Sequence, residues 1–198
     1  DTVWYAFYNQ PEIWLWNCHA LEAALEEIIE EDKLVKSLKN YQHYFYSFLT
    51  DLYRNKLGLE EKRESDIKLI ESLLSYLQDS KTDYNNFFRN LHKVHETKNN
   101  LFQDEKGKAW LEKFQERFKE EKISKEISQE KMLANNPKFI LRNYLAHQAI
   151  KKAESGDFSE VELLANILNN PFDEQPKYEG YSEPSPEWGK SLEISCSS

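Results

Sequence analysis

Apolar residues recur every three or four positions along most of this chain, and the strict alternation typical of β-strands is almost absent. Such spacing places side chains on one face of an α-helix, so the pattern predicts an all-α fold. The residues expected to face inward are, in chain order, Trp14, Cys18, Leu21, Leu25 and Ile28; Leu34, Leu38, Tyr41, Phe45, Phe48 and Leu52; Ile67, Ile70, Leu73, Leu74 and Leu77; Phe87, Phe88, Leu91 and Val94; and Trp110, Phe114 and Phe118.

Local signals set the expected ends of these helices. Pro11 suits a first helical position, where its missing N–H is not needed. The acidic run 26–32 ends or bends the first helix. Gly58 is expected to close the second helix, and the third should run from about residue 66 to 78. Asp83 is a reasonable N-cap for the fourth.

The region after the fourth helix carries weaker signals. The polar stretch 97–107 is expected to form a loop before the helix of Trp110. A short, weakly apolar segment with Ile127 and Met132 then leads into the last third of the chain.

The last third carries the clearest pattern. Asn136-Pro137 is expected to open the strongest helix, with Asn136 as its cap and Pro137 as its first residue, and Gly156 to close it. Ser159 and Glu162 fit a capping box at the start of the next helix, which Asn170-Pro171 ends. The inward residues are Phe139, Ile140, Tyr144, Leu145 and Ala149, then Val161, Leu164, Ile167 and Leu168.

The composition shifts to Pro, Gly, Ser and acidic residues over 171–187, which favours an extended strap. We therefore expect three regions, a lead-in over 1–10, a helical region over 11–170 and an extended tail over 171–198.

Composition narrows the classes of function. The 198 residues fit one domain or one large lobe, and an aromatic content of 14% argues against a disordered chain. A net charge of -9 argues against nucleic acid as a partner. No apolar run approaches the roughly 20 residues of a membrane span, so no membrane partner is expected. The 2 cysteines suit a reducing compartment, and we expect a cytoplasmic protein.

Catalytic signals are sparse. The 5 glycines never cluster, so no glycine-rich loop is present to hold nucleotide phosphates. Asp157-Phe158-Ser159 slightly resembles a kinase metal-binding tripeptide, but the start of a helix explains it better. No Ser/His/Asp or Cys/His arrangement is specified by the sequence. We assign no catalytic, cofactor-binding or metal-binding residue to this chain.

One pair of histidines could begin a metal site. His92 and His95 lie one helical turn apart, and Glu96 is adjacent. A metal ion needs three or four convergent ligands, and no second pair is evident. A surface or half-buried pair of histidines is the favoured interpretation.

The 2 cysteines differ in context. Cys18 lies on the apolar face of the first expected helix, which favours a packed, inert thiol. Cys196 stands in a polar Ser-Cys-Ser-Ser terminus, where an accessible thiol can be oxidised. The residues leave two alternatives open for Cys196, a redox-active thiol or a bystander.

Motifs at both ends of the chain point to a family. The segment NPKFILRNYLAHQAIKKAESGDFSEVELLANILNNPF, followed by PSPEWGKSLEISCSS, closely resembles the carboxy-terminal region of the selenoprotein O family. The opening YAFYNQPEIWLWNCHALEAAL resembles the family segment shortly after its kinase-like metal-binding motif. KLGL near Leu57 and DYNNFFRNL near Phe87 lie in the expected order between them. Trp4 departs from the family, which usually has Arg before YAF.

The resemblance implies a pseudokinase, with a fold that resembles protein kinases, which transfers AMP from ATP to protein hydroxyl groups using Mg²⁺. In the family, the phosphate-binding and metal-binding residues precede the segment that matches Asp1. We therefore expect the helical C-lobe portion of a kinase-like fold with an extended C-terminal tail, inactive alone. The start at Asp1, without Met, also favours a piece of a longer protein.

The same resemblance bears on partners and on the tail. It implies the remainder of the kinase-like domain and protein substrates as partners, with ATP and Mg bound by the full-length protein and none by this segment. In many relatives the position matching Cys196 is a selenocysteine, or a cysteine that can pair with a Cys upstream of the position of Asp1. A Cys18–Cys196 disulfide stays open but is not what the family suggests. The alternative function is a stand-alone all-α interaction module.

Overall fold

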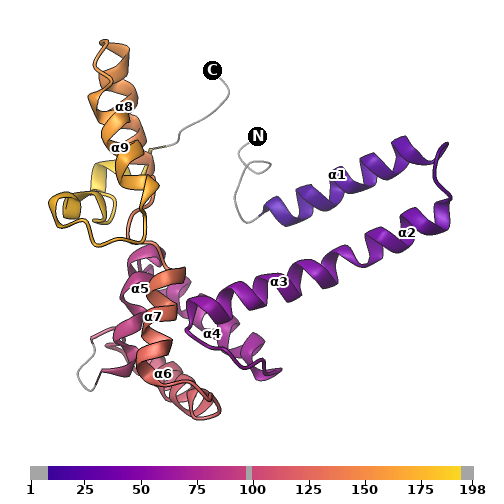
Figure 1. Cartoon of the computed structure of the whole chain (residues 1–198), viewed down its shortest axis with the longest axis horizontal. Coiled ribbons are helices and arrows are strands. Elements are labelled where there is room, and N and C mark those ends of the chain that lie inside the picture. Colours follow the sequence, from indigo (N-terminus) through magenta and orange to yellow (C-terminus); the bar gives the residue numbers. More distant parts are fainter. Residues whose placement is uncertain (1–8, 97–99, 193–198) are drawn as a thin grey trace. The chain divides into compact units, whose positions relative to one another are not determined.

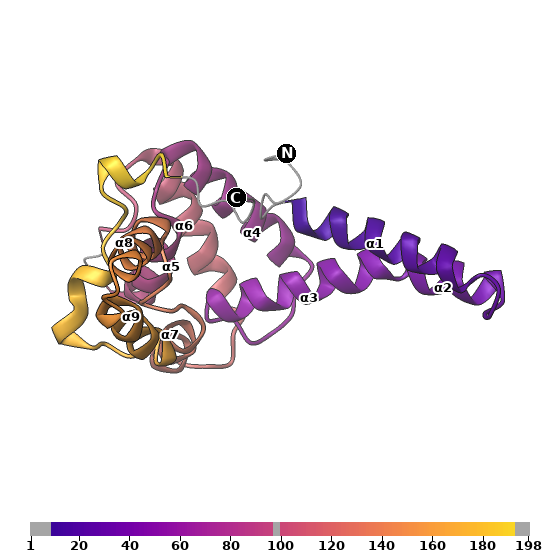
Figure 2. The same ribbon diagram turned by 90° about the horizontal axis from the view of Figure 1, so that it is seen from above.

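The computed structural model describes residues 9–96 and 100–192. Every regular element in those ranges is an α-helix or a 3-10 helix, which confirms the predicted all-α class (Figures 1 and 2). The chain divides into two compact units, unit 1 (Asp1–Tyr53) and unit 2 (Arg54–Ser198).

Unit 1 holds α1 (Gln10–Leu25), α2 (Glu31–Lys39) and most of α3 (Tyr41–Lys56). Pro11 lies in the first turn of α1, and α1 ends where the acidic run 26–32 begins, both as predicted. The second expected helix is two helices, because the chain breaks at Asn40. Helices α1 and α2 contact each other, and the Tyr41 hydroxyl donates to the carbonyl oxygen of Pro11 at 3.2 Å.

The apolar faces of unit 1 are open. No residue of α1, α2 or α3 is buried in the part of the chain that the structure describes. The side chains of Trp14, Leu21 and Phe48 are 62%, 59% and 67% exposed, so their predicted burial is wrong. Ile28 lies beyond the end of α1 and is exposed, as is Leu52. The helical period is correct, but the apolar face is only partly covered, since Leu25, Leu34, Leu38 and Phe45 are half-buried.

Unit 2 contains the core of the described chain. Its helices are α4 (Ser65–Ser80), α5 (Tyr84–Asn90), α6 (Glu105–Phe118), α7 (Lys125–Asn135), α8 (Asn143–Glu154) and α9 (Ser159–Asn169), with the 3-10 helices η2 (Leu91–His95), η3 (Pro176–Tyr181) and η4 (Glu187–Gly189). Helix α4 packs on α6, α7 packs on α5 and η2, and α8 packs on α9.

Aromatic rings fill much of this core. Phe102, Trp110 and Phe114 follow one another with ring centroids 5.2 and 5.4 Å apart. Phe102 also contacts Phe87, and the indole N–H of Trp110 donates to the Leu69 carbonyl at 2.9 Å. Stacked and edge-on rings contribute packing energy beyond their buried area, so these contacts fix α4, α5 and α6 together.

Three predicted helix ends in unit 2 are confirmed. The Asp83 carboxylate accepts from the backbone N–H of Asn86 at 2.9 Å and caps α5. Gly58 adopts φ 67°, and a Cβ there would lie 2.4 Å from Ser128 Oγ, so only glycine fits. Gly156 adopts φ 86° just after α8, as expected. The loop expected over 97–107 ends sooner, because Asp104 caps α6.

The predicted start of the strongest helix is wrong. Asn136 follows the end of α7 and is buried, and α8 begins only at Asn143. The Asn136 amide is held by the last residue of α3, since its Nδ2 donates to the Lys56 carbonyl at 2.9 Å and its Oδ1 accepts from Lys56 Nζ at 3.2 Å. Because both polar atoms of the Asn136 side chain bond to Lys56, this side chain does not cap a following helix.

The predicted capping box at α9 is also wrong. Helix α9 has no side-chain cap from its N-cap residue, Phe158. The Asp157 carboxylate instead accepts from the Ser159 backbone N–H at 3.0 Å. Asp157 therefore accepts a hydrogen bond at the start of α9. A helix start is what the sequence analysis favoured for this tripeptide over metal binding.

Three predicted features of the helical faces and the tail are revised. Ile67 and Val161, expected to face inward, lie on helices but are 49% and 43% exposed. The segment 171–187 is not extended, because it folds into turns and η3. Gln175 precedes η3 in a left-handed conformation and donates to the carbonyls of Ile167 and Asn170. The tail thus folds back on the end of α9.

Candidate functional site

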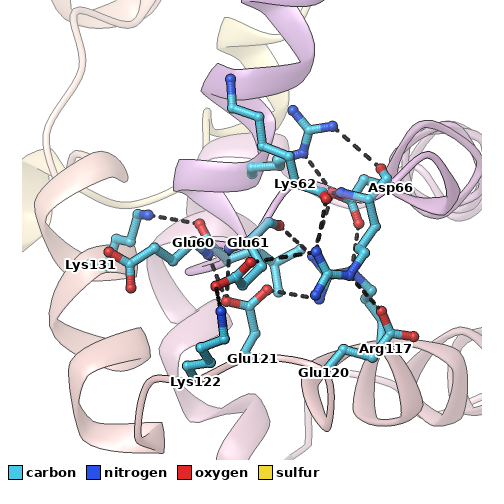
Figure 3. Close-up of polar contacts among 12 residues, drawn as sticks. Glu60, Glu61, Lys62, Asp66, Arg117, Glu120, Glu121, Lys122 and Lys131 are labelled. Carbon is cyan, nitrogen blue, oxygen red and sulfur yellow. Dashed lines mark hydrogen bonds and ion pairs between the residues drawn. The ribbon is translucent and has the colours of Figure 1, made fainter.

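A fully buried carboxylate, Asp66, joins three segments of unit 2 (Figure 3). It lies in the first turn of α4, and its Oδ2 accepts from Arg54 Nε at 2.6 Å. Its Oδ1 accepts from Arg117 Nε at 2.6 Å, and the backbone N–H of Arg63 donates to Oδ2 at 3.0 Å. One side chain therefore ties the end of α3, the start of α4 and the end of α6.

The ion pairs decide the protonation of this cluster. Burial alone would raise the pKa of Asp66, but hydrogen bonds from Arg117, Arg54 and the Arg63 backbone hold that pKa below its ordinary value. Burial would lower the pKa of Arg117, whereas hydrogen bonds to Asp66 and Glu121 raise it. The pair is therefore charged at neutral pH. A buried pair with such geometry is costly to break from one side.

Glu121 extends the cluster to the turn before α4. Its Oε1 accepts from Arg117 Nη1 at 2.7 Å, while Oε2 accepts from the backbone N–H groups of Glu60 and Glu61 at 2.9 and 3.0 Å. Arg117 Nη2 donates to the Glu61 carbonyl at 2.6 Å. We name Arg54, Asp66, Arg117 and Glu121 the Asp66 network. Its charges are satisfied by protein partners, so the network positions helices and is a poor candidate for acid–base chemistry.

A second charged cluster lies where the tail meets the helices. It lines a polar pocket of about 380 Å³ and includes Arg89 and Lys138, both nearly buried. Lys138 Nζ donates to Glu174 Oε2 at 2.8 Å and to Glu179 Oε1 at 2.5 Å. Arg89 Nη2 donates to Glu174 Oε1 at 2.6 Å. These cations clamp the tail to α5 and to the segment after α7, and they are neutralised by its carboxylates.

The histidines proposed as the start of a metal site have separate partners. His92 Nδ1 bonds with the Arg89 carbonyl at 2.9 Å, and His95 Nε2 bonds with Ser128 Oγ at 3.1 Å. Burial, and to a lesser extent nearby Lys125, lowers the pKa of His95 to about 4. The half-buried pair favoured from the sequence is confirmed. Among residues 9–96 and 100–192, no three His, Cys, Asp or Glu side chains are placed to hold a metal ion.

The cysteines fall in different situations. Cys18 is half-buried in α1, a free thiol beside Leu21 and Leu25 at the wall of a groove, which partly matches the packed thiol that we expected. The redox candidate Cys196 lies outside the described residues, as does Trp4. The proposed role of Cys196 stays a prediction.

The groove lies within unit 1. It has a volume of about 770 Å³ and an apolar wall formed by α1, α2 and α3. Its apolar lining includes Cys18, Leu21, Leu25, Leu34, Leu38, Tyr41, Phe45 and Phe48. These are largely the residues whose spacing predicted an inward face. The described residues of unit 1 therefore form an open apolar groove.

Sequence reasoning missed the charged residues that organise unit 2. Asp66 precedes the apolar positions Leu69, Ile70 and Leu73, and Arg117 follows Phe114 by three residues on α6. A charged side chain on an otherwise apolar helix face is rarely buried unless it is paired. That pattern could have identified both residues as buried, but the sequence does not show that they are partners.

The described residues define an all-α protein with paired charge clusters and an open apolar groove. No helix in the part of the chain that the structure describes is long and apolar enough to cross a bilayer.

Comparison with known proteins supplies the family. A family model described as "Protein adenylyltransferase SelO" matches residues 1–169. The protein nucleotidyltransferase YdiU of Aliivibrio fischeri (strain MJ11) is 44% identical over 199 residues, which cover 98% of this chain and 41% of the relative. The protein of the same name from Pseudomonas fluorescens is 43% identical over 205 residues, covering 100% of this chain and 42% of the relative. This chain belongs to the SelO family, as its motifs predicted.

Each match covers nearly all of this chain but less than half of the relative. The chain spans about two fifths of the length of the curated relatives that it matches. Vibrio parahaemolyticus YdiU shows the same relation, at 44% identity over 98% of this chain and 42% of the relative.

Proposed function

We propose that this chain is the C-terminal helical portion of a SelO-family protein adenylyltransferase, and that it forms part of a kinase-like C-lobe. The whole protein would transfer AMP from ATP, with Mg²⁺, to hydroxyl groups of protein substrates. The observation that carries the proposal is the unequal coverage, because 98% of this chain matches only 41% of a YdiU relative. The order of the sequence motifs supports the C-terminal placement.

In this proposal the chain supplies a scaffold and the remainder supplies the nucleotide site. The paired charges of the Asp66 network support a positioning role, since each oxygen of Asp66 accepts from an arginine. ATP and Mg²⁺ would be held by residues outside this segment. We keep the proposed division into a lead-in over 1–10, a helical region over 11–170 and a tail over 171–198, and a cytoplasmic location.

The test compares this chain with a chimera. In the chimera, this chain replaces the matched 199 residues of the Aliivibrio fischeri relative. Each protein is incubated with labelled ATP, Mg²⁺ and a mixture of candidate protein substrates. We expect AMP transfer by the chimera and none by this chain alone. Robust labelling by the chain alone, or an inactive but folded chimera, would overturn the proposal.

The Cys196 proposal has its own test in the same chimera. We expect the Cys196→Ala variant to change the response of AMP transfer to an oxidant. Identical responses in the two proteins would make Cys196 a bystander.

A stand-alone all-α interaction module is the second candidate, and the open groove of unit 1 favours it. The DNA immediately upstream of the codon for Asp1 separates the two. An in-frame kinase-like region supports the first candidate, whereas a nearby start codon supports the second.

A further inference from the structure

Unit 1 has apolar residues at helical spacing but no buried residue in its helices. The same spacing in unit 2 gives a closed core, in which Phe88, Phe114 and Phe139 are at most 1% exposed. Helices of 9 to 16 residues gain most of their stability in proteins from packing of an apolar face. The sequence pattern of unit 1 predicts a packed apolar face, but its helices contain no buried residue.

Part of the exposed apolar surface of unit 1 lines one groove, to which the exposed Leu21 and Phe48 contribute. Leu21 and Leu25 of α1, Leu34 and Leu38 of α2 and the ring of Phe45 of α3 line it. The cavity of about 770 Å³ falls in the size range of sites that receive side chains or small ligands. A contiguous apolar surface of this kind usually marks an interaction site.

The occupant follows from the family comparison. More than half of each matched YdiU relative lies outside the stretch that corresponds to this chain, since the match covers 41% to 42% of its length. In the relatives that additional polypeptide is covalently attached to the matching segment. Attachment gives it a high effective concentration at the groove, which a second copy of the chain does not have.

The polar edge of the groove indicates the chemistry of the docked surface. Glu22 and Asp51 line the groove beside its apolar wall, and the acidic run 26–32 spans the turn after α1 and the start of α2. A complementary surface would present apolar side chains to the groove and basic side chains at its margin. Such charges would mainly select the partner and orient it.

We propose that the groove of α1, α2 and α3 is the docking surface for the SelO-family polypeptide that lies outside this segment. On docking, the three helices acquire the core that they lack alone. The inference rests on the proposed function, because it takes this chain to be one portion of that larger enzyme.

The thiol of Cys18 reports on the groove, because Cys18 lines it and is free. We would measure alkylation of Cys18 by iodoacetamide, by peptide mass spectrometry, in this chain and in the Aliivibrio fischeri chimera, both carrying Cys196→Ser. We expect alkylation to be at least tenfold slower in the chimera. Docking would exclude the reagent from the groove.

A matched control uses the other side of α1. Ala23 is exposed and does not line the groove. In a Cys18→Ser, Cys196→Ser background, Ala23→Cys should be alkylated at similar rates in the chain and in the chimera. Equal slowing at position 23 and at Cys18 would indicate general burial of α1 and would overturn the assignment to the groove.

The remaining outcomes separate the inference from the proposed function. AMP transfer by a chimera whose Cys18 reacts as fast as in the chain overturns the inference and leaves the function standing. A protected Cys18 in an inactive chimera overturns the proposed activity and leaves the docking of the groove standing. If Cys18 of the chain alone becomes protected as the concentration rises, with a dimer in sedimentation velocity, then the occupant is a second copy and the inference is wrong.

Discussion

Units 1 and 2 have similar apolar patterns but bury their apolar faces to different extents. In unit 2 the predicted inward residues Phe87, Phe88, Leu91 and Val94 are all buried, whereas in unit 1 Trp14 and Phe48 are more than half exposed. The period of a pattern fixes the helix and its apolar face. Burial of that face needs a second surface, which unit 2 provides within itself and unit 1 provides only in part.

The largest expected effect tests this difference at two phenylalanines. Phe114 is fully buried between Trp110 and Phe118, so Phe114→Ala should lower the free energy of unfolding by about 3 to 5 kcal/mol. Phe48→Ala should change it by less than about 0.5 kcal/mol, because that ring is 67% exposed. Urea unfolding followed by circular dichroism measures both. Equal losses would break the comparison between the units.

The next effect concerns the Asp66 network. Asp66→Asn removes the charge that pairs with Arg54 and Arg117, and we expect a loss of about 3 kcal/mol. The matched control is Asp79→Asn, since Asp79 is exposed and pairs with Lys106 across 3.3 Å, where about 0 to 1 kcal/mol is expected. Chemical denaturation at pH 7 provides the measurement. A similar result for the two variants would show that the buried network is not a major contributor.

Two glycines sharpen the description of unit 2 as closely packed. Gly58→Ala would combine a left-handed backbone with a Cβ 2.6 Å from the Ser128 carbonyl oxygen, and we expect a loss of about 2 to 3 kcal/mol. Gly156→Ala meets open space, so only the backbone strain of about 1 kcal/mol remains. Thermal unfolding distinguishes them. A loss at Gly156 as large as that at Gly58 would contradict the packing argument.

The smallest expected effect is a pH dependence that originates in His95. Its pKa is lowered from 6.5 to about 4, so the unfolded chain takes up a proton before the folded chain does. The stability from the neutral ring is complete above about pH 6.5 and is lost as the pH falls toward 4. The loss should be about 2 kcal/mol, reduced from the full shift because the ring is half-buried.

The His95→Gln variant provides the comparison for this pH dependence. Its amide can still bond with Ser128 but does not titrate. The difference in unfolding free energy between the two proteins should change between pH 6.5 and 4 and stay constant above 7. A constant difference over the whole range would exclude His95 as the source.

Local signals predicted those parts of the fold that depend on local contacts. Asp83 caps α5 because its carboxylate reaches an N–H three residues away. Asn136-Pro137 carries an equally good local signal, yet Asn136 bonds to Lys56, 80 residues earlier, and the helix begins later. Arg142, just before α8, forms a two-pronged pair with Asp83, 59 residues earlier. Contacts between distant residues therefore overrode the local preference.

The candidate sites were less predictable than the helices for the same reason. The lining of the groove could be anticipated from the spacing of Leu21, Leu25, Leu34 and Leu38, although its openness could not. The Asp66 network could not be assembled, because Asp66 and Arg117 are 51 residues apart. The family could be recognised, since its motifs are contiguous stretches of sequence.

Amide hydrogen exchange of the two units tests the central claim most directly. In this chain alone, peptides from α1 and α2 should exchange much faster than those from α4 and α6, because open helices lack packing protection. In the chimera with the Aliivibrio fischeri relative, α1 and α2 should become at least tenfold slower, while α4 and α6 change little. Equal protection of both units in the chain alone, or no gain in α1 and α2 in an active chimera, would contradict the account.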